Sequence, residues 1–227
     1  MKIINWNIGR PTASKYSQIL DKLYELDGDI VVITETNSSV VPPKLYNVIS
    51  TNLLPPNFDG VIYKKGENRT TVWTKFPIVK SYPTYDAYTS ICTNLETPDG
   101  ILTLYASIIG ILGGKGQRFQ DDLQGQLADF DSIFPNKNVC FAGDYNVTFK
   151  GYIYPSYSAR QILNNTFQKF TLTNVTAAIP DCVDHISMST EFIKNKKVTV
   201  DMWNLSKTLS DHIGTSVTLR EIEEAFV

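Results

Sequence analysis

The order of apolar segments at the start of the chain constrains the fold more than any other feature of the sequence. Residues 2–6 form a short apolar strand, and apolar side chains recur every three or four residues over 16–26, which predicts an amphipathic helix. The uninterrupted apolar run 30–33 is typical of a strand buried on both faces. A strand, a helix and a second strand in this order predict two parallel strands joined by a right-handed crossover.

A similar alternation returns later in the chain, between runs of successive strands. Further strands are expected at residues 60–63, 70–74, 90–96, 101–105, 138–141, 182–188, 197–202 and 213–219. Further helices are expected at residues 119–134 and 159–168, and a hairpin turn at 97–100. Two similar halves built in this way predict an α/β (α+β) fold in four layers, with two packed mixed β-sheets flanked by helices.

The length and composition limit the classes of protein to consider. A chain of 227 residues with 42% hydrophobic residues can bury a substantial core, so we expect a single domain spanning residues 1–227. The net charge of −2 excludes the basic excess of a sequence-independent nucleic-acid binder. Three cysteines without paired spacing argue against a disulfide framework or a zinc site. No apolar run reaches the roughly 20 residues of a membrane span, and the first residues do not resemble a signal peptide, so we expect a cytoplasmic monomer.

Polar side chains that suit a hard metal ion stand at the ends of several predicted strands. They are Asn7, Glu35, Asp144, Asn146, Asp184, Asp211 and His212. Taken singly, each has a structural explanation, because Asp and Asn form turns and a lone histidine is usually a packed one. Taken together, oxygen donors at several strand ends predict a site for Mg²⁺, Mn²⁺ or Ca²⁺. The chain has two histidines, and both His185 and His212 follow an aspartate and precede an isoleucine.

Six short segments carry a resemblance to a known family. In chain order they are Asn5-Trp6-Asn7, Thr34-Glu35-Thr36, Thr74-Lys75-Phe76-Pro77-Ile78, Gly143-Asp144-Tyr145-Asn146, Val183-Asp184-His185-Ile186 and Ser210-Asp211-His212. They resemble, in the same order and over nearly the whole chain, the motifs of the endonuclease/exonuclease/phosphatase superfamily, which has the DNase I-like fold. The resemblance implies a four-layered sandwich that hydrolyses phosphate esters with a divalent metal ion.

The same resemblance implies which residues hold the metal. Glu35 would be the main ligand, with Asn7 and Asp211 beside it. The ion would be Mg²⁺ or Mn²⁺, and its role would be to neutralise the charge that develops on the phosphoryl group.

The resemblance also implies the catalytic residues. Asp144 would orient or deprotonate the attacking water, and Asn146 would hydrogen-bond the scissile phosphate. His212 would stabilise charge on that phosphate, while Asp184 would hold its other ring nitrogen. Carboxylates that accept protons and imidazoles that donate to a transition state are ordinary parts of such reactions.

The sequence departs from the family pattern at one strand. Family members usually present a histidine or a tyrosine to the scissile phosphate there, whereas this chain has Ser107, with Tyr105 two residues earlier. Either Ser107 fills the role weakly, or Tyr105 takes it through a shift in register, or activity is reduced. The chain also lacks the extra aspartate that some repair nucleases carry near residues 8–10, so a branch specialised for abasic sites is a less favoured expectation.

Two further segments are candidate substrate contacts. Residues 110–118 are rich in glycine and contain Lys115 and Arg118, which suits a loop over a phosphate, although a plain surface connection is the more common use of such a loop. Residues 149–157 combine several tyrosines, among them Tyr152, with neighbouring basic residues. Aromatic rings beside cations can stack on bases and hold a nucleic-acid backbone, but tyrosine-rich loops serve packing equally often.

The leading hypothesis is therefore a metal-dependent phosphodiesterase, most simply a nuclease that acts on DNA or RNA. A second hypothesis is a phosphatase on a nucleotide, a sugar phosphate or an inositol phosphate. A third is a binding protein that keeps the fold and has lost catalysis, which the serine at position 107 keeps open.

Overall fold

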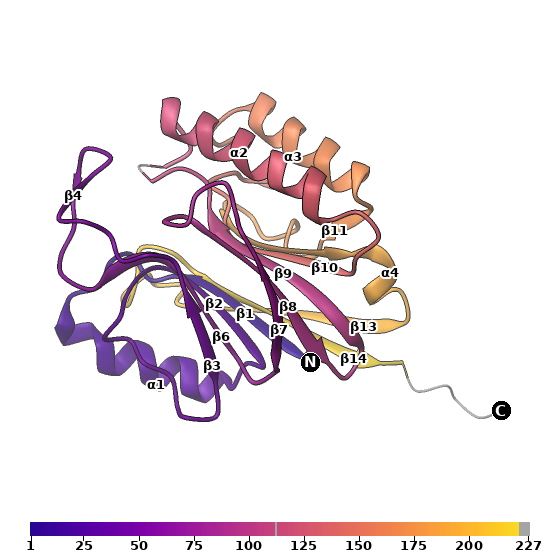
Figure 1. Cartoon of the computed structure of the whole chain (residues 1–227), viewed down its shortest axis with the longest axis horizontal. Coiled ribbons are helices and arrows are strands. Elements are labelled where there is room, and N and C mark those ends of the chain that lie inside the picture. The colour runs from indigo at the N-terminus through magenta and orange to yellow at the C-terminus, as the bar shows by residue number, and fades with distance from the viewer. Residues whose placement is uncertain (112, 223–227) are drawn as a thin grey trace.

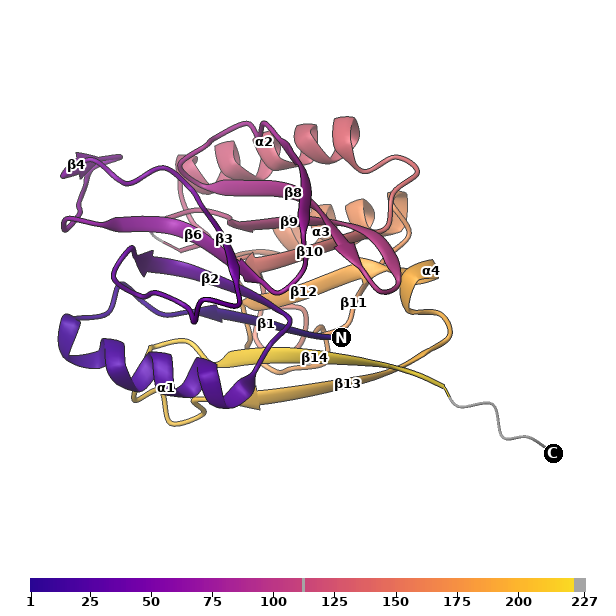
Figure 2. The same ribbon diagram turned by 60° about the horizontal axis from the view of Figure 1, so that its bottom comes forward.

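Two six-stranded mixed β-sheets pack face to face in the computed structural model, which describes residues 1–111 and 113–222 (Figures 1 and 2). In spatial order, the first sheet consists of β13 (Lys196–Trp203), β14 (Gly214–Glu221), β1 (Lys2–Asn7), β2 (Ile30–Asn37), β6 (Glu67–Thr74) and β3 (Asn47–Ser50). The second consists of β11 (Leu172–Asn174), β12 (Asp184–Ser189), β10 (Val139–Asp144), β9 (Gly100–Ile108), β8 (Ser90–Thr97) and β7 (Ile78–Tyr82). A separate two-stranded hairpin pairs β4 (Asn57–Phe58) with β5 (Val61–Ile62).

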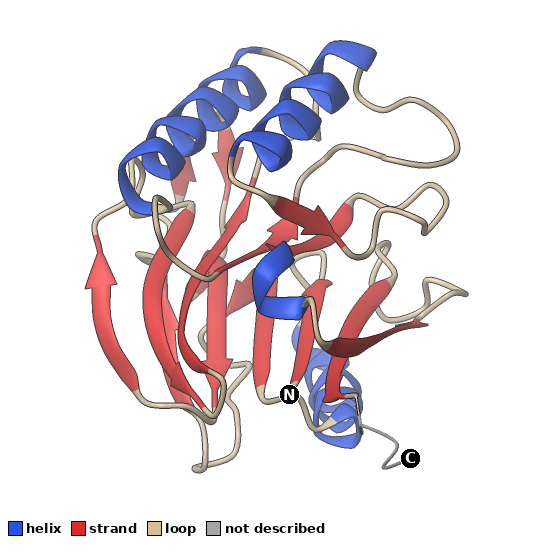
Figure 3. Ribbon diagram, turned by 90° about the vertical axis from the view of Figure 1, so that its right-hand side faces the viewer, coloured by secondary structure: helices blue, strands red, loops and turns tan. Residues whose placement is uncertain are grey.

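Helices cover the outer faces of both sheets, which completes the four layers (Figure 3). On the first sheet lies α1 (Tyr16–Leu26), after a 3-10 turn η1 (Ala13–Lys15). On the second sheet lie α2 (Gln117–Ile133) and α3 (Tyr157–Lys169), and α4 (Thr190–Ile193) is a single short turn after β12. The expected fold class is therefore confirmed. Among the described residues, no helix is long and apolar enough to cross a membrane.

The apolar runs of the central strands are buried on both faces, as their sequence predicts. In β1, Ile3 faces the core between the sheets and Ile4 faces α1. In β2, Val32 faces the core between the sheets and Val31 faces α1. Every one of these four side chains is at most 1% exposed. A polar side chain within such a strand must find hydrogen-bond partners in the core, as Asn5 does, and the other polar residues of β1 and β2 stand toward the strand ends.

The centre of each sheet is a parallel pair joined through a helix. β1 pairs with β2 and β9 pairs with β10, each in parallel register. Residues 97–100 form the expected hairpin between β8 and β9, where Thr97 pairs with Gly100. The first helix is capped at Asp27, which takes the left-handed conformation. Gly28 instead allows close packing, since a Cβ there would lie 2.6 Å from Cδ1 of Ile4.

Short edge strands are the elements that the sequence does not indicate. β3, β7 and β11 have three to five residues and lie at or beside sheet edges. Their side chains are mostly exposed or half-buried, so they lack the apolar pattern on which the prediction depends. The strand expected at 60–63 is reduced to the two paired residues of β5.

Candidate active site

The predicted site residues come from both sheets and meet at one edge of the sandwich. Asn7 and Asp144 are the last residues of β1 and β10, and Glu35 lies near the end of β2. β12 runs antiparallel to β10, so its first residue, Asp184, is directly paired with Asp144. β14 runs antiparallel to β1, which brings the loop before it, with His212, to the same edge. The strand directions therefore gather residues that are far apart in the chain.

The Asp144 carboxylate is buried and held on both oxygens. Its Oδ1 accepts a hydrogen bond from the backbone N–H of Asn146 at 2.8 Å, and its Oδ2 accepts one from Nδ2 of Asn7 at 3.0 Å. Burial and the negative charge of Asp184 raise the pKa of Asp144 to about 7, against the opposing effect of His212. A carboxyl group with a pKa near neutrality is suited to accept a proton in catalysis.

His212 and Asp184 form an ion pair beside Asp144. Nδ1 of His212 lies 2.6 Å from Oδ2 of Asp184, whose side chain is 1% exposed. Burial alone would lower the pKa of His212, but the carboxylates of Asp184, Asp144 and Asp211 outweigh it and raise the pKa to about 10. The imidazole is therefore charged at neutral pH, and its Nε2 is available to donate to an anion.

Three residues hold the backbone of His212 in place. The indole N–H of Trp6 and Nδ2 of Asn204 donate to the His212 carbonyl at 3.3 and 2.6 Å. The His212 N–H donates to Oγ of Ser210, which in turn donates to the backbone carbonyl of Asn7 at 2.7 Å. The sequence does not indicate the contacts of Trp6 and Asn7, because these residues lie 206 and 203 positions away from their partners in the chain.

Asn5 connects the two sheets beneath the site. Its fully buried amide Nδ2 donates to the carbonyl oxygens of Gly143 at 2.9 Å and His185 at 3.2 Å. It thereby ties β1 of the first sheet to β10 and β12 of the second. Gly143 is required by the close approach of β10 to β9, since a Cβ there would lie 1.8 Å from the Ser107 carbonyl oxygen. The glycine before Asp144 is thus part of the support for that carboxylate.

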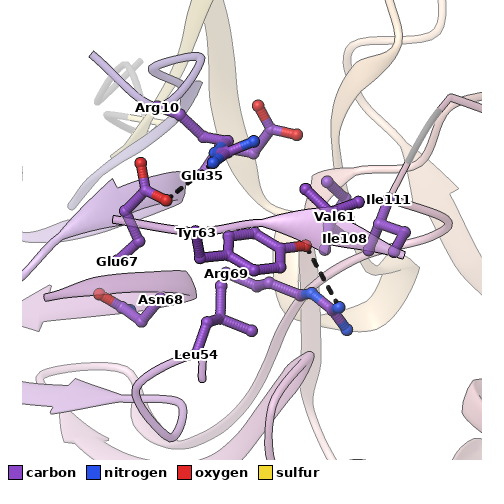
Figure 4. A pocket seen from close by; sticks show the side chains of 10 residues that line it. All are labelled: Arg10, Glu35, Leu54, Val61, Tyr63, Glu67, Asn68, Arg69, Ile108 and Ile111. Carbon is purple, nitrogen blue, oxygen red and sulfur yellow. Dashed lines mark hydrogen bonds and ion pairs between the residues drawn. The ribbon is translucent and has the colours of Figure 1, made fainter. Parts of the chain in front are cut away.

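Glu35 lies in a strained position at the end of β2. Its φ of 51° is in the left-handed region, and the register between β2 and β6 pairs Thr34 and Thr36 but omits Glu35. The backbone of Arg10 donates to the Glu35 carbonyl at 2.8 Å, and both residues line a small cavity beside Tyr63 (Figure 4). Burial raises the pKa of Glu35. The positive charges of His212 and Arg10 act to lower this pKa, and the negative charge of Asp211 acts to raise it. Backbone strain of this kind is typical of functional sites.

The donors at this edge fit a divalent cation such as Mg²⁺. Polar atoms of Asp144, Asp184 and His212 lie within 4.8 Å of one another, but the protonated imidazole of His212 has no lone pair for a cation, so only the two carboxylates of this group could be ligands. This group differs from the Glu35, Asn7 and Asp211 set that the family resemblance implies. Oδ1 of Asp184 is buried and accepts no hydrogen bond within the described part of the chain. A buried carboxylate oxygen without a donor is stabilised by a cation.

The other two members of the implied ligand set lie close by. Oδ1 of Asn7 accepts a hydrogen bond from the N–H of Gly9 at 2.8 Å and, being a carbonyl oxygen, keeps a second lone pair. Asp211 packs against Gly9, where an added Cβ would lie 2.6 Å from its Oδ1. Asp211 lines the groove over His212, whereas Glu35 lines the adjoining cavity with Arg10.

The groove over the site is a hollow of about 450 Å³. It is lined by Asn146, Tyr152, Tyr154, Pro180, Asp181, Cys182, Val183, Asp184, Lys207, Asp211, His212 and Ile213. Asn146 has a φ of 50°, and its Nδ2 donates to the carbonyl of Ile109 at 3.0 Å. The structure places Tyr152 here, as the substrate expectation requires, while Lys115 lies over the neighbouring Tyr154 ring at 6.0 Å.

Ser107 and Tyr105 do not face the groove. Both are fully buried on the face of β9 that packs against α2. Oγ of Ser107 donates to the side chain of Gln126 at 2.7 Å, and the Tyr105 hydroxyl donates to Asp129 at 2.6 Å. The expectation that either residue contacts substrate is corrected by this placement, because alternate residues of a strand share a face and this face is covered by the helix.

Arg118 is also committed to a structural role. Its guanidinium pairs with Asp59, Asp86 and Asp122 at 3.0, 2.6 and 2.9 Å, in a network that Arg69 shares. These contacts tie α2 to the loops before β5 and β8. A guanidinium that already pairs with three carboxylates has little capacity to bind a phosphate. The expected contact of Arg118 with substrate is therefore corrected to a structural role.

His185, the second histidine, is fully buried behind the site. Its Nε2 lies 2.9 Å from the carbonyl of Cys182 and 3.1 Å from that of Val147, and its Nδ1 lies 3.0 Å from Oγ1 of Thr176. Two carbonyl acceptors require a proton on Nε2, so the neutral ring satisfies all three contacts. Burial lowers the pKa of His185 to about 4. The two histidines that follow an aspartate in the sequence therefore differ in role: His185 is a buried structural residue, and His212 lies in the candidate site.

The buried neutral state of His185 predicts acid sensitivity. Because its pKa is about 4 in the folded chain and about 6.5 when unfolded, its contribution to stability is complete above pH 6.5 and is lost as pH falls toward 4. Over that window we expect the loss of about 3 kcal/mol in the free energy of unfolding. Denaturant titrations of the wild type and His185→Gln at pH 7 and 4.5 measure it, and equal pH slopes in the two proteins would contradict the assignment.

Comparison with known proteins agrees with this geometry. The model of the endonuclease/exonuclease/phosphatase family matches residues 4–212. The chain belongs to this family. No curated protein matches the chain.

Solved structures of the family share the fold at low sequence identity. The endonuclease domain of TRAS1, a telomere-specific non-LTR retrotransposon, is 14% identical with a TM-score of 0.71, covering 97% of this chain and 98% of that one. An AP endonuclease from Archaeoglobus fulgidus is 13% identical with a TM-score of 0.71, covering 96% and 99%. A 3′-5′ exonuclease from Neisseria meningitidis is 15% identical with a TM-score of 0.68, covering 96% and 99%. At this identity the likeness concerns the fold.

Proposed function

We propose that this member of the endonuclease/exonuclease/phosphatase family is a Mg²⁺- or Mn²⁺-dependent phosphodiesterase that acts on nucleic acid. The observation that carries the proposal is the cluster of Asp144, Asp184 and His212, of which Asp184 and His212 line the groove. It combines a carboxylate with a pKa near 7 and a charged imidazole in one site. The proposal of nucleic acid as substrate is supported by a Neisseria 3′ phosphatase of the same fold, which is bound to a DNA hairpin product.

The residues of the site divide the reaction between them. Asp144 accepts the proton of the attacking water, and its two hydrogen bonds from Asn146 and Asn7 fix the direction in which its lone pairs point. His212 donates from Nε2 to a phosphate oxygen, while Asp184 keeps the ring oriented and charged. Glu35, Asn7 and Asp211 would hold a divalent cation, as the family pattern implies, and the chemistry it would supply is neutralisation of charge at the phosphate.

Metal removal tests the proposal directly. We expect hydrolysis of single- and double-stranded oligonucleotides to stop in EDTA and to return on addition of Mg²⁺ or Mn²⁺. Without the ion, the negative phosphate lies next to several carboxylates, and His212 alone does not neutralise their charge. Release of fragments is followed on denaturing gels. Turnover that is unchanged by EDTA would rule out the metal-dependent site.

A substrate panel separates this function from its alternatives. The same protein is incubated with DNA, RNA, AMP and inositol phosphates in Mg²⁺, and phosphate release is compared with chain cleavage. Release of inorganic phosphate from the small compounds alone would identify a phosphatase in place of a nuclease. Absence of turnover on every ester, together with specific binding, would identify a binding protein.

A further inference from the structure

The groove above His212 continues into a second hollow of different chemistry. The first hollow, of about 450 Å³, has Tyr152 and Tyr154 on one wall, which we call the tyrosine half. The second, of about 330 Å³, is lined by Arg10, Lys15 and Lys207, which we call the basic half. Lys207 and Asp211 line both hollows, so the two halves adjoin next to His212.

The tyrosine half is a fixed aromatic surface. The Tyr154 hydroxyl accepts a hydrogen bond from the N–H of Gly114 at 2.7 Å, and the Tyr154 backbone exchanges hydrogen bonds with Thr148 at 2.9 and 3.0 Å. The Tyr152 and Tyr154 rings meet edge to face at 6.2 Å. Tyr152 nevertheless remains 55% exposed. Tyr154 is thus held in position, and the Tyr152 ring beside it is open to solvent and offers a stacking face.

The basic half concentrates positive charge in a chain whose net charge is −2. Nζ of Lys15 donates to the carbonyls of Thr208 and Leu209 at 2.9 and 3.2 Å, which fixes it beside the segment that leads to His212. Lys207 stands between the two hollows. Arg10 already pairs with Glu67 at 2.9 Å, so Lys15 and Lys207 are the two cations of this half that can match the phosphates flanking a cleaved bond, against the carboxylate of Asp211.

We propose that the substrate enters this groove as an unpaired nucleic-acid strand. The base next to the scissile phosphate stacks on Tyr152, and the following phosphates lie along the basic half at Lys207 and Lys15. A base can reach a tyrosine face only when it is not paired within a duplex, so an aromatic wall at this depth favours single strands, frayed ends or loops. This inference rests on the proposed nuclease function, and it names the form of the substrate and two residues that select it.

Binding measured without turnover tests the inference. Fluorescence anisotropy in EDTA gives the Kd of the full-length protein for a labelled single strand and for a duplex of the same sequence. We expect the single strand to bind at least tenfold more tightly. Tyr152→Ala should weaken binding of the single strand by about 5- to 100-fold, the usual range for loss of one stacked base, and change duplex binding less than twofold. Tyr157→Ala is the matched control, because Tyr157 is 76% exposed and lies outside the groove.

The basic half is tested in the same assay. Lys207→Gln should weaken binding of single strands of different sequence uniformly and reduce the slope of log Kd against log salt by about 1, as for one phosphate contact. Lys194→Gln, on an exposed helix turn, should leave both unchanged. Equal affinity for single strand and duplex, or equal effects of Tyr152→Ala and Tyr157→Ala, would overturn the inference.

The outcome is separable from that of the proposed function. Preference for the single strand that depends on Tyr152 supports the inference even if no ester is hydrolysed. Metal-dependent hydrolysis without that preference overturns it and leaves the proposed function standing.

Discussion

Replacement of Asp144 by asparagine is expected to lower kcat by about 10²- to 10⁴-fold, the usual contribution of a general base. The substitution keeps the shape of the side chain and removes its ability to take a proton from water. It also leaves either the N–H of Asn146 or Nδ2 of Asn7 without its acceptor. Initial rates of oligonucleotide cleavage at saturating Mg²⁺ measure the effect.

Stability distinguishes loss of chemistry from loss of fold in this variant. Burial raises the pKa of Asp144 to about 7, so its charged form is disfavoured in the folded chain at neutral pH. Loss of this buried charge and loss of one acceptor have opposite effects on stability, so Asp144→Asn should keep a Tm close to that of the wild type while losing activity. Asp131→Asn, a surface substitution at a carboxylate that is 57% exposed, is the matched control and should change neither. Retention of more than a tenth of wild-type kcat in Asp144→Asn would remove Asp144 from the role of base.

Replacement of Asp184 by asparagine is expected to lower the pKa of His212 from about 10. The ion pair with Asp184 is the largest effect that raises it, and once that charge is removed, burial disfavours the imidazolium. The chain has two histidines, so the imidazole resonances in an NMR titration of the metal-free protein are few and are assigned with His185→Gln. In the wild type, we expect one histidine to titrate near pH 4 and the other near pH 10.

The same ion pair predicts a pH dependence of stability at the alkaline side. Because the pKa of His212 is higher in the folded chain than its unfolded value of about 6.5, the stabilisation is complete below pH 6.5 and is lost as pH rises toward 10. Asp184→Asn should make that slope smaller, because the largest effect that raises the His212 pKa is removed. Asp181→Asn, at another carboxylate of the groove, should leave the His212 titration near pH 10. A His212 that stays charged at pH 9 in Asp184→Asn would contradict the pairing.

The repeated pattern of apolar strands and amphipathic helices was sufficient to predict the layers. Central strands such as β1 and β2 contain successive apolar residues, Ile3-Ile4 and Ile30-Val31-Val32-Ile33, because they are buried on both faces, and this is a local property of the sequence. The edge strands β3, β7 and β11 were missed for the opposite reason, since their side chains are partly solvated. A buried strand has an apolar pattern that can be recognised in the sequence, whereas these partly exposed strands have none.

The position of the site was predictable for a related reason. A polar residue within a buried strand must have its hydrogen bonds satisfied in the core, whereas a strand end is open to substrate, so functional side chains such as Asn7 and Asp144 stand at strand ends. The pairing of Asp184 with His212 was expected from the family pattern, and the distance of 2.6 Å between them agrees with it.

The sequence by itself therefore determined the layers of this protein and the strand ends that carry its chemistry, because period and burial are local properties. Only the tertiary structure decided which way each side chain faces and which distant loops meet. It turned Ser107 and Tyr105 toward α2, matched Arg118 with three aspartates, and brought Lys207 within the same groove as Tyr152. These outcomes depend on strand register and loop packing between residues far apart in the chain, which no local pattern encodes.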